Sequence, residues 1–402
     1  MTTTTQPPVP AAAPSSARRE PWRVSLAGVR LVAGLELRQR VRSTKWKWAL
    51  VSVAVLIGGI TFLVWGANHA FGSDSGGDYG GPGDVVFGLV VFFVLFLGLV
   101  VSPTLSATSI NGDVRDGTMA PLQATALSAA DIVLGKLLAS WAASLAFLAV
   151  ALPFITIAYF DGRMPALAML TVVLVLAIEL LVVCAIGLGW SALTARTSAS
   201  AVLTYTTVAV LVAVLPIIFG LLSVTFTEEV TVTSSYREYV YLDGPEPESA
   251  KPGDPRPAGV PDNAQQDEQG MYYVCRDNTY TSSMPRTDKL WWLLAVNPYV
   301  IVADSAPSPD WSPDGYYGDI GILSGLKQAV REARVGPSTS FDDCDYQVSY
   351  EEQQRRDRID SLPAVWPWGL AVQALLAVGG VALGVRRLSV PYGKLPAGSR
   401  VA

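Results

Sequence analysis

The sequence predicts an all-α membrane protein with six transmembrane helices, an N-terminal interfacial helix, a cytoplasmic coupling helix and a large extracellular loop before the last span. Half of the 402 residues are apolar and 16% are charged, whereas soluble domains carry roughly 25% charged residues. Six apolar runs each reach the ~20 residues that a helix needs to cross ~30 Å of hydrocarbon. Runs of this length exclude barrel strands, so helices must satisfy the backbone in lipid.

The chain divides into four parts. Residues 1–21 form an arm rich in Thr, Pro and Ala, which is predicted to be disordered in the cytoplasm. Residues 22–226 hold the interfacial helix and five spans, at about 46–65, 85–107, 132–159, 166–193 and 199–226. Residues 227–361 form the extracellular loop, and residues 362–402 hold the sixth span and a basic cytoplasmic tail.

The distribution of charge predicts the orientation. Residues 18–48 carry nine basic and two acidic side chains, whereas residues 227–361 carry 24 acidic and 12 basic ones. Positive loops stay in the cytoplasm. An even number of spans also places both basic ends on one side, so we expect a multi-pass protein of the cell membrane with both termini in the cytoplasm.

The segment before the first span is predicted to be an amphipathic helix over Leu26–Trp48. Val29 and Val32 recur at helical spacing, and Arg38 and Arg40 lie elsewhere around the helix. Basic amphipathic helices lie in the plane of the membrane interface and gain from anionic lipid. A plain basic linker is the alternative.

The extracellular loop has parts of different character. Residues 236–269 are rich in Pro, Glu, Asp and Gly and are expected to lack a fixed fold. The apolar stretch at residues 289–305 is too short to span; it predicts either a re-entrant or interfacial pair of segments or a small extracellular core element. Cys275 and Cys344 can form a disulfide worth roughly 4 kcal/mol, although the sequence does not prove their pairing.

No catalytic constellation is evident. The only histidine is His69, which excludes histidine-rich metal sites and histidine relays. A Walker A motif is also absent, because Gly135-Lys136 is followed by Leu137 and Ala130 stands five residues before Gly135. The chain is therefore expected to be no enzyme and to hold no cofactor or metal; ATP and Mg²⁺ would be bound by another subunit.

Glu179 is the one ionisable residue deep within a span. Such residues are costly in hydrocarbon and usually face the interior of a bundle. A hydrogen-bonded packing role and a role toward a substrate or proton both remain open. Gly380 and Gly384 form a GxxxG pattern in the last span, which permits close helix approach.

A polar connector, Ile110–Lys136, joins the second and third spans. Thr118 is expected to cap a short helix beginning at Met119. Ser128 and Asp131 have the spacing of a capping box that opens the third span. From the residues alone, a rigid coupling element and an ordinary polar turn are equally good readings.

The connector resembles that of the ABC-2 permease family. The matching residues are the acidic start Asp113-Val-Arg-Asp116-Gly117-Thr118, the Pro-Leu-Gln-Ala-Thr-Ala-Leu-Ser element and the closing Ile132-Val-Leu-Gly135-Lys136. The basic interfacial helix, the six spans, the long last loop and Asn297-Pro298 follow in the family's order, over about residues 22–402. Where the family usually has Glu, this chain has Asp113 and Asp116, which shortens the reach of both side chains.

The resemblance implies two permease subunits, identical or different, docked on two ATP-binding subunits and embedded in lipid, with no nucleic acid. It assigns the ATPase contact to Asp113, Arg115, Asp116, Gly117, Thr118, Leu122, Gly135 and Lys136 in the connector and to Glu36, Arg38 and Arg40 in the interfacial helix. The expected function is ATP-driven export of a small or lipid-like substrate by alternating access. The alternatives are a non-transporting subunit that passes force or a signal to an extracellular partner, and an intramembrane enzyme acting through Glu179.

Overall fold

The computed structural model describes residues 20–71, 83–119, 122, 125, 127–161, 166–240, 259–267, 271–306, 321–342, 344 and 350–389. Nearly all of the arm and tail that were predicted to flank the spans lie outside these ranges, as does much of the loop expected to lack a fixed fold. Within the described residues, six helices are long and apolar enough to cross a membrane, which confirms the predicted fold class.

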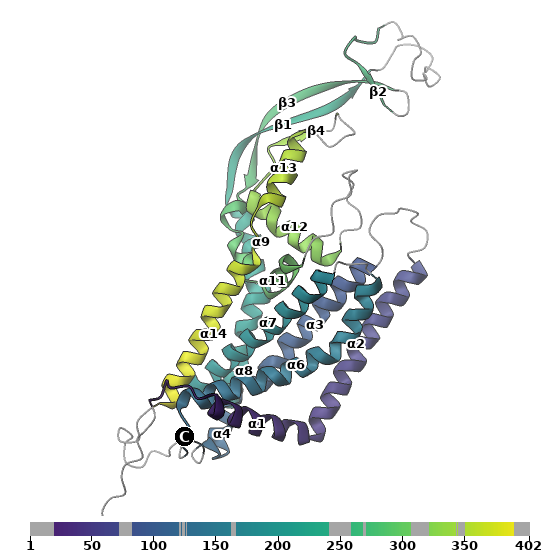
Figure 1. The fold of residues 1–402 in the computed structure, drawn as a ribbon. Coiled ribbons are helices and arrows are strands. Elements are labelled where there is room, and N and C mark those ends of the chain that lie inside the picture. Colours follow the sequence, from purple (N-terminus) through teal and green to yellow (C-terminus); the bar gives the residue numbers. More distant parts are fainter. Residues whose placement is uncertain are drawn as a thin grey trace, which may run out of the picture.

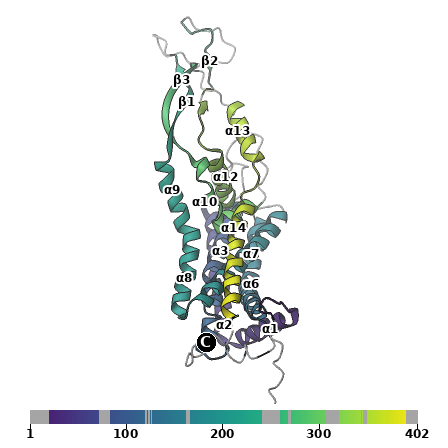
Figure 2. The same cartoon turned by 90° about the vertical axis from the view of Figure 1, so that its left-hand side faces the viewer.

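The six spans lie side by side in one bundle (Figure 1). They are α2 (Thr44–Phe71), α3 (Gly83–Ser106), α6 (Ala129–Asp161), α7 (Ala166–Leu193), a stack of α8 (Thr197–Ala209), the π-helix η1 (Val210–Val214) and α9 (Leu215–Thr225), and finally α14 (Trp366–Leu388). The stack stands at one side of the bundle (Figure 2), and little of its surface is buried. One apolar cluster fills the upper half of the bundle and a second fills the lower half.

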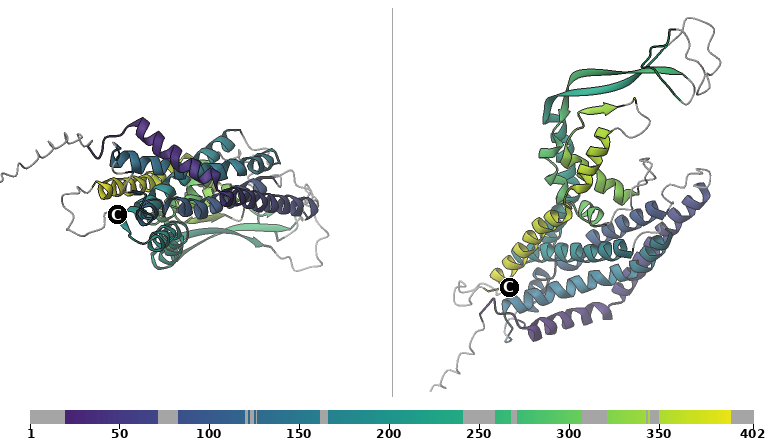
Figure 3. Two further views of the ribbon diagram at one scale, coloured as in Figure 1. Left: turned by 90° about the horizontal axis from the view of Figure 1, so that it is seen from below. Right: turned by 45° about the horizontal axis from the view of Figure 1, so that its top comes forward.

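At the lower end, α1 (Leu26–Arg42) lies across the lower ends of the spans (Figure 3, left). The predicted helix over Leu26–Trp48 is too long, because Ser43 is extended and a new helix, α2, begins at Thr44. Val29 and Val32 are buried, whereas Leu31 and Leu35 are exposed. One apolar face of α1 therefore packs on protein and another remains open, as an interfacial helix requires.

The upper end carries a β-hairpin that the sequence analysis did not predict. Strand β1 (Thr227–Tyr239) pairs antiparallel with β3 (Tyr272–Pro285). The short strands β2 (Gln265–Gln266) and β4 (Ser340–Asp342) complete a sheet of order β2-β3-β1-β4. Both long strands expose most of their residues, so they lack the apolar alternation that reveals a half-buried strand.

Several short helices cover the top of the bundle. They are the 3-10 helix η2 (Thr287–Lys289), α10 (Trp292–Ala295), α11 (Pro298–Ser305), α12 (Ile322–Val335) and α13 (Tyr350–Ser361). Helix α11 is almost entirely buried, and Ile301 belongs to the same apolar cluster as Phe87 of α3 and Val172 of α7. The apolar stretch at residues 289–305 is thus two short helices that pack into the upper core.

Candidate functional site

A polar junction at the lower end joins α1, α6 and the short helix α4 (Asn111–Arg115). Its centre is Lys136 on α6, whose side chain is 1% exposed and forms ion pairs with Glu36 of α1 and Asp113 of α4. The two carboxylates are 20% and 33% exposed. A buried ammonium is tolerated only when charged partners compensate its lost hydration. Lys136 therefore holds three elements together.

Two glycines let α1 lie close against α6. A Cβ added to Gly135 would lie 2.5 Å from the Cβ of Val32, and one added to Gly28 would lie 2.8 Å from Oδ2 of Asp131. Neither distance is compatible with a side chain. Gly135 and Lys136, adjacent in the sequence, thus supply close packing and charge to the same contact.

The predicted capping box at the start of α6 is present and has a second use. Ser128 Oγ accepts from the amide of Asp131 at 3.0 Å, and Asp131 Oδ2 accepts from the amide of Ser128 at 3.2 Å. Asp131 Oδ1 also accepts from the amide of Ser25, the residue that caps α1, and Ser128 Oγ donates to Arg23 O. The box therefore ties the beginnings of both helices together.

The tip of the connector is exposed. Helix α4 ends at Arg115 and is followed by Gly117, whose φ of +74° lies in the left-handed region. The amide of Thr118 bonds to the carbonyl of Asp113, which is the Schellman arrangement. Arg115 and Asp116 pair with each other at 3.2 Å and are 68% and 61% exposed. Exposed pairs of this kind contribute little to stability, so both side chains are available to a partner.

Beyond the tip, the predicted short helix lies partly outside the described residues. Met119 and Leu122 within it are helical; Met119 is buried and Leu122 is partly buried against the lower apolar cluster. The hydroxyl of Thr118 donates to Asp113 O, toward the end of α4. Met119 and Leu122 after the tip, and Asp113 before it, therefore attach the connector to the bundle on both sides of its exposed tip.

A polar clamp that sequence reasoning missed joins the connector to α7. The hydroxyl of Ser191 accepts from the amides of Ile110 and Asn111 and donates to Asn111 Oδ1 at 3.1 Å. Asn111 Nδ2 donates to the backbone carbonyl of Thr194, just past α7. No local pattern distinguishes Ser191 from other small residues in apolar helices, so only the fold reveals the clamp.

Arg40 anchors the far end of α1. Its guanidinium donates to the carbonyl of Leu105 at 2.9 Å and to Ser140 Oγ at 3.4 Å. Burial lowers the pKa of Arg40 from its ordinary value, and the carboxylate of Glu36 opposes that shift. Arg38 points away and is exposed, so only Arg40 of this pair supports the fold.

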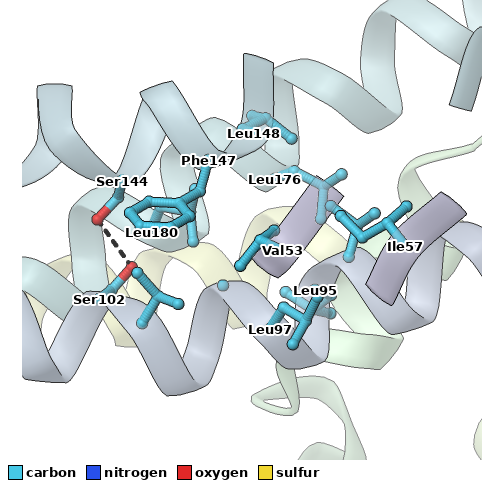
Figure 4. Close-up of a pocket in the computed structure, with 13 residues that line it drawn as sticks. Val53, Ile57, Leu95, Leu97, Ser102, Ser144, Phe147, Leu148, Leu176 and Leu180 are labelled. Atoms are coloured by element: carbon cyan, nitrogen blue, oxygen red, sulfur yellow. Dashed lines mark hydrogen bonds between the residues drawn. The ribbon is translucent and has the colours of Figure 1, made fainter. Parts of the chain in front are cut away.

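A small apolar cavity of about 20 Å³ lies between α2, α3, α6 and α7. Figure 4 shows its lining, which includes Ile57, Leu95 and Phe147, and the hydrogen bond between Ser102 and Ser144 at one end. No charged side chain lines it. The cavity has room for about one water molecule, so the spans would have to separate before a cargo could enter, and it offers an ion no compensating charge.

Glu179 lies halfway along α7, and its side chain is completely buried. Gln373 of α14, also completely buried, is its neighbour and donates from Nε2 to the carbonyl of Val296 at 3.0 Å. A lone amide in the sixth apolar run was the available signal for Gln373. Asn297, which follows Val296 in the sequence, donates from Nδ2 to Val212 O at 3.0 Å. The carbonyl of Val212 lacks its α-helical donor because Pro216 has no N–H.

At the upper end, a buried carboxylate and a disulfide connect the elements. Asp304 of α11 accepts from Arg331 at 3.0 Å and from the amides of Val365 and Trp366 at the start of α14. A disulfide joins Cys275 of β3 to Cys344, with a Cα–Cα distance of 5.7 Å.

Cys184, in contrast, is buried in α7 with a free thiol. In the part of the chain that the structure describes, no group of three or more His, Cys, Asp or Glu side chains could hold a metal ion.

The comparisons with known proteins agree with this architecture. Residues 30–243, more than half of the chain, match a family model described as an ABC-2 family transporter protein. This range includes the polar junction, the connector and the first five spans. No curated protein matches the chain.

Proposed function

The chain belongs to the ABC-2 transporter family and is the permease of an ABC transporter, and from this premise we propose that it exports a lipid-like substrate with energy from a separate ATPase. Two such permeases, identical or different, work as a pair in the cell membrane. The partner ATPases bind ATP and Mg²⁺, so this chain needs no cofactor and catalyses no reaction itself. The ABC-2 family implies an ATP-binding partner, and the polar junction offers that partner a rigid contact.

The observation that carries the proposal is the position of Lys136. It links the base of the exposed tip, at Asp113, to α6 and to α1 through ion pairs in which the ammonium is buried and the carboxylates are partly exposed. Asn111 links the same short helix to α7. A force on Arg115 and Asp116 therefore reaches three long elements without passing through a flexible segment, which is what a coupling element needs.

The orientation follows from charge. The lower end carries the basic residues of α1 and the two arginines that end α14, Arg386 and Arg387. Segments rich in Lys and Arg stay in the cytoplasm. We therefore place both termini, α1 and the connector in the cytoplasm, where an ATPase is available, and the hairpin outside the cell.

The lining of the cavity favours an apolar cargo. Its side chains are aliphatic and aromatic apart from two serines, which already bond to each other. An ion would lose its hydration there without compensation. Alternating access would then consist of motions of α2 and α6 that open this region first to one leaflet and then to the other.

The test is co-expression with a neighbouring ATPase, followed by purification of the complex. Asp116→Lys reverses the charge of the exposed tip and is expected to reduce assembly and permease-stimulated ATP turnover at least tenfold. Glu229→Lys, the same change at an exposed residue of the hairpin, is the matched control and should alter neither. Unchanged assembly and turnover in Asp116→Lys would rule out the coupling role of the connector.

The projecting hairpin favours a second candidate function, in which the subunit passes force or a signal to an extracellular partner. The sheet extends well beyond the bundle (Figure 1) and exposes most of both long strands. A photoreactive residue at Thr279 in the full-length chain tests this candidate. Capture of a cell-surface protein that depends on ATP turnover would favour it over transport.

A further inference from the structure

Three hydrogen-bond acceptors lie together in the middle of the bundle without a donor. Both carboxyl oxygens of Glu179 lack a hydrogen-bond partner, and so does Oε1 of the neighbouring Gln373. Both side chains are completely buried. Buried polar atoms are nearly always satisfied in folded proteins, so three unsatisfied acceptors at one contact point to a missing donor.

No positive charge is available to stabilise an ionised Glu179. The helices and helical segments packed against α7 are α14, α3, α6, α8 and α11. The titratable side chains that the structure describes on these helices are Asp131 and Lys136 in the lower junction, Arg386 and Arg387 at the end of α14, Asp304 bonded to Arg331, and Tyr159, Tyr205 and Tyr299. The sequence of α3 and α6 adds only two acidic residues, Asp84 and Asp161. On α7 itself, Cys184 bonds to Ser144. None of these groups supplies a cation beside the carboxyl.

We propose that Glu179 is a proton-binding site, neutral in this conformation, and that its hydroxyl donates to Oε1 of Gln373. The carboxylate takes one proton from water to become a carboxylic acid. That single proton satisfies the Gln373 oxygen, gives the hydroxyl oxygen of Glu179 a bond, and removes a charge that the surroundings cannot compensate. A buried acid without a counter-ion neutralises itself for the same reason.

A metal ion fits these residues less well. Hard cations take about six to eight oxygen ligands, whereas this contact offers three free acceptors. Gln373 Nε2 donates to Val296 O, whereas its oxygen Oε1 has no partner, so the oxygen is the acceptor that remains to be satisfied. The chemistry of the contact thus matches a single proton.

The bound proton has mechanical consequences. It joins α7 to α14, and Gln373 joins α14 to the turn between α10 and α11. Asn297 in that turn joins it to the fifth span at Val212. Separation of α14 from α7 would expose the carboxyl to water and release the proton, so the packing of these helices is linked to protonation. This linkage is independent of the cargo and of the ATPase.

Infrared difference spectroscopy on the full-length protein in lipid nanodiscs tests the site. The spectrum of wild type minus Glu179→Gln at neutral pH should contain the carbonyl stretch of one protonated carboxyl group. Gln373→Leu should retain that band but shift it to higher frequency, because the hydrogen bond to Gln373 is lost. Glu229→Gln, the same change at an exposed carboxylate of the hairpin, should lose only ionised carboxylate bands.

Two results would overturn the proposal. One is a difference spectrum for Glu179→Gln that contains only ionised carboxylate bands at neutral pH. The other is a protonated band in wild type that sodium or potassium displaces, since a metal ion would then be the occupant. If Glu179→Gln does not fold, the frequency shift in Gln373→Leu decides, and an unshifted or missing band in that variant contradicts the assignment.

Discussion

At each end of the bundle a buried charged side chain joins several elements, and the two ends neutralise that charge differently. At the lower end, Lys136 is held by Glu36 and Asp113, both of which are partly exposed. At the upper end, Asp304 is held by Arg331, which is 14% exposed, and by two backbone amides at the start of α14. The lower charge depends on side chains that reach solvent, and the upper charge depends mainly on groups that do not.

This difference indicates that the two ends of the bundle have different functions. A carboxylate at the surface can exchange a partner within the molecule for one on a docking protein, so the lower junction can respond to contact. Asp304 has both oxygens occupied by donors that are mostly shielded from solvent, and the disulfide constrains the same end. We therefore interpret the lower end as the part that moves under load and the upper end as a fixed frame.

The strongest challenge to this comparison is Asp304→Ala. It leaves Arg331 and two amides without an acceptor, and breaking a buried charged contact costs about 3–5 kcal/mol. We expect a large fall in the thermal unfolding midpoint of the purified protein. Asp357→Ala, at an exposed residue of α13, should change it little. Equal midpoints for the two variants would show that the upper end is not the fixed frame.

Lys136→Met tests the other end. The variant removes the buried ammonium and leaves two carboxylates facing each other, but both can be hydrated. We expect a smaller loss of about 1.5–3 kcal/mol in the free energy of unfolding, and a much larger loss of ATPase assembly. Adding Glu36→Gln and Asp113→Asn should restore stability without restoring assembly. A stability loss exceeding that of Asp304→Ala would reverse the comparison.

The clamp between the connector and α7 offers a finer test. Asn111→Ala and Ser191→Ala remove partners of the same hydrogen-bond cluster, so their effects should not add. Coupling energies for residues in one network are about 0.5–3 kcal/mol. Measuring the unfolding free energy of both single variants and the double variant gives this value. Simple additivity would indicate that α4 and α7 are not mechanically joined.

The sequence predicted features that arise from local or strongly periodic patterns. The six spans follow from apolar length, and the apolar stretch at residues 289–305 was correctly predicted to be too short to span. The capping box of Ser128 and Asp131 was predicted because its two residues are three positions apart. The family resemblance added the connector and the interfacial helix, which local patterns alone did not distinguish from an ordinary turn and linker.

Other features depend on contacts between distant segments, and the sequence could not supply them. The bond between Gln373 and Val296 joins residues 77 positions apart, and Asp304 reaches amides 61 and 62 positions away. The hairpin was missed for a different reason. Its strands are rich in Thr, Val and Tyr, which favour strands, but their exposure on both faces removes the period-two pattern.

The smallest expected effect concerns the base of the hairpin, where Arg286 donates to both oxygens of Asp288 at 2.9 and 2.8 Å. Arg286 holds the pKa of Asp288 below its ordinary value. A lowered pKa in the folded state means that the pair stabilises the fold above the unfolded pKa of about 3.9, and that this contribution is lost as the pH falls through the folded value.

Asp288→Asn removes this contribution at neutral pH. Because the pair is partly exposed, with side chains 29% and 26% exposed, we expect a loss of only about 0.2–1 kcal/mol. Hydrogen exchange at residues 286–291, corrected for intrinsic rates, measures it locally. Wild type and variant should differ near neutral pH and converge in strong acid, since protonated Asp288 no longer attracts Arg286. A difference that persists unchanged into strong acid would mean that Asp288 fixes the hairpin by its shape and not by its charge, and that the upper frame owes its rigidity to Asp304 and the disulfide alone.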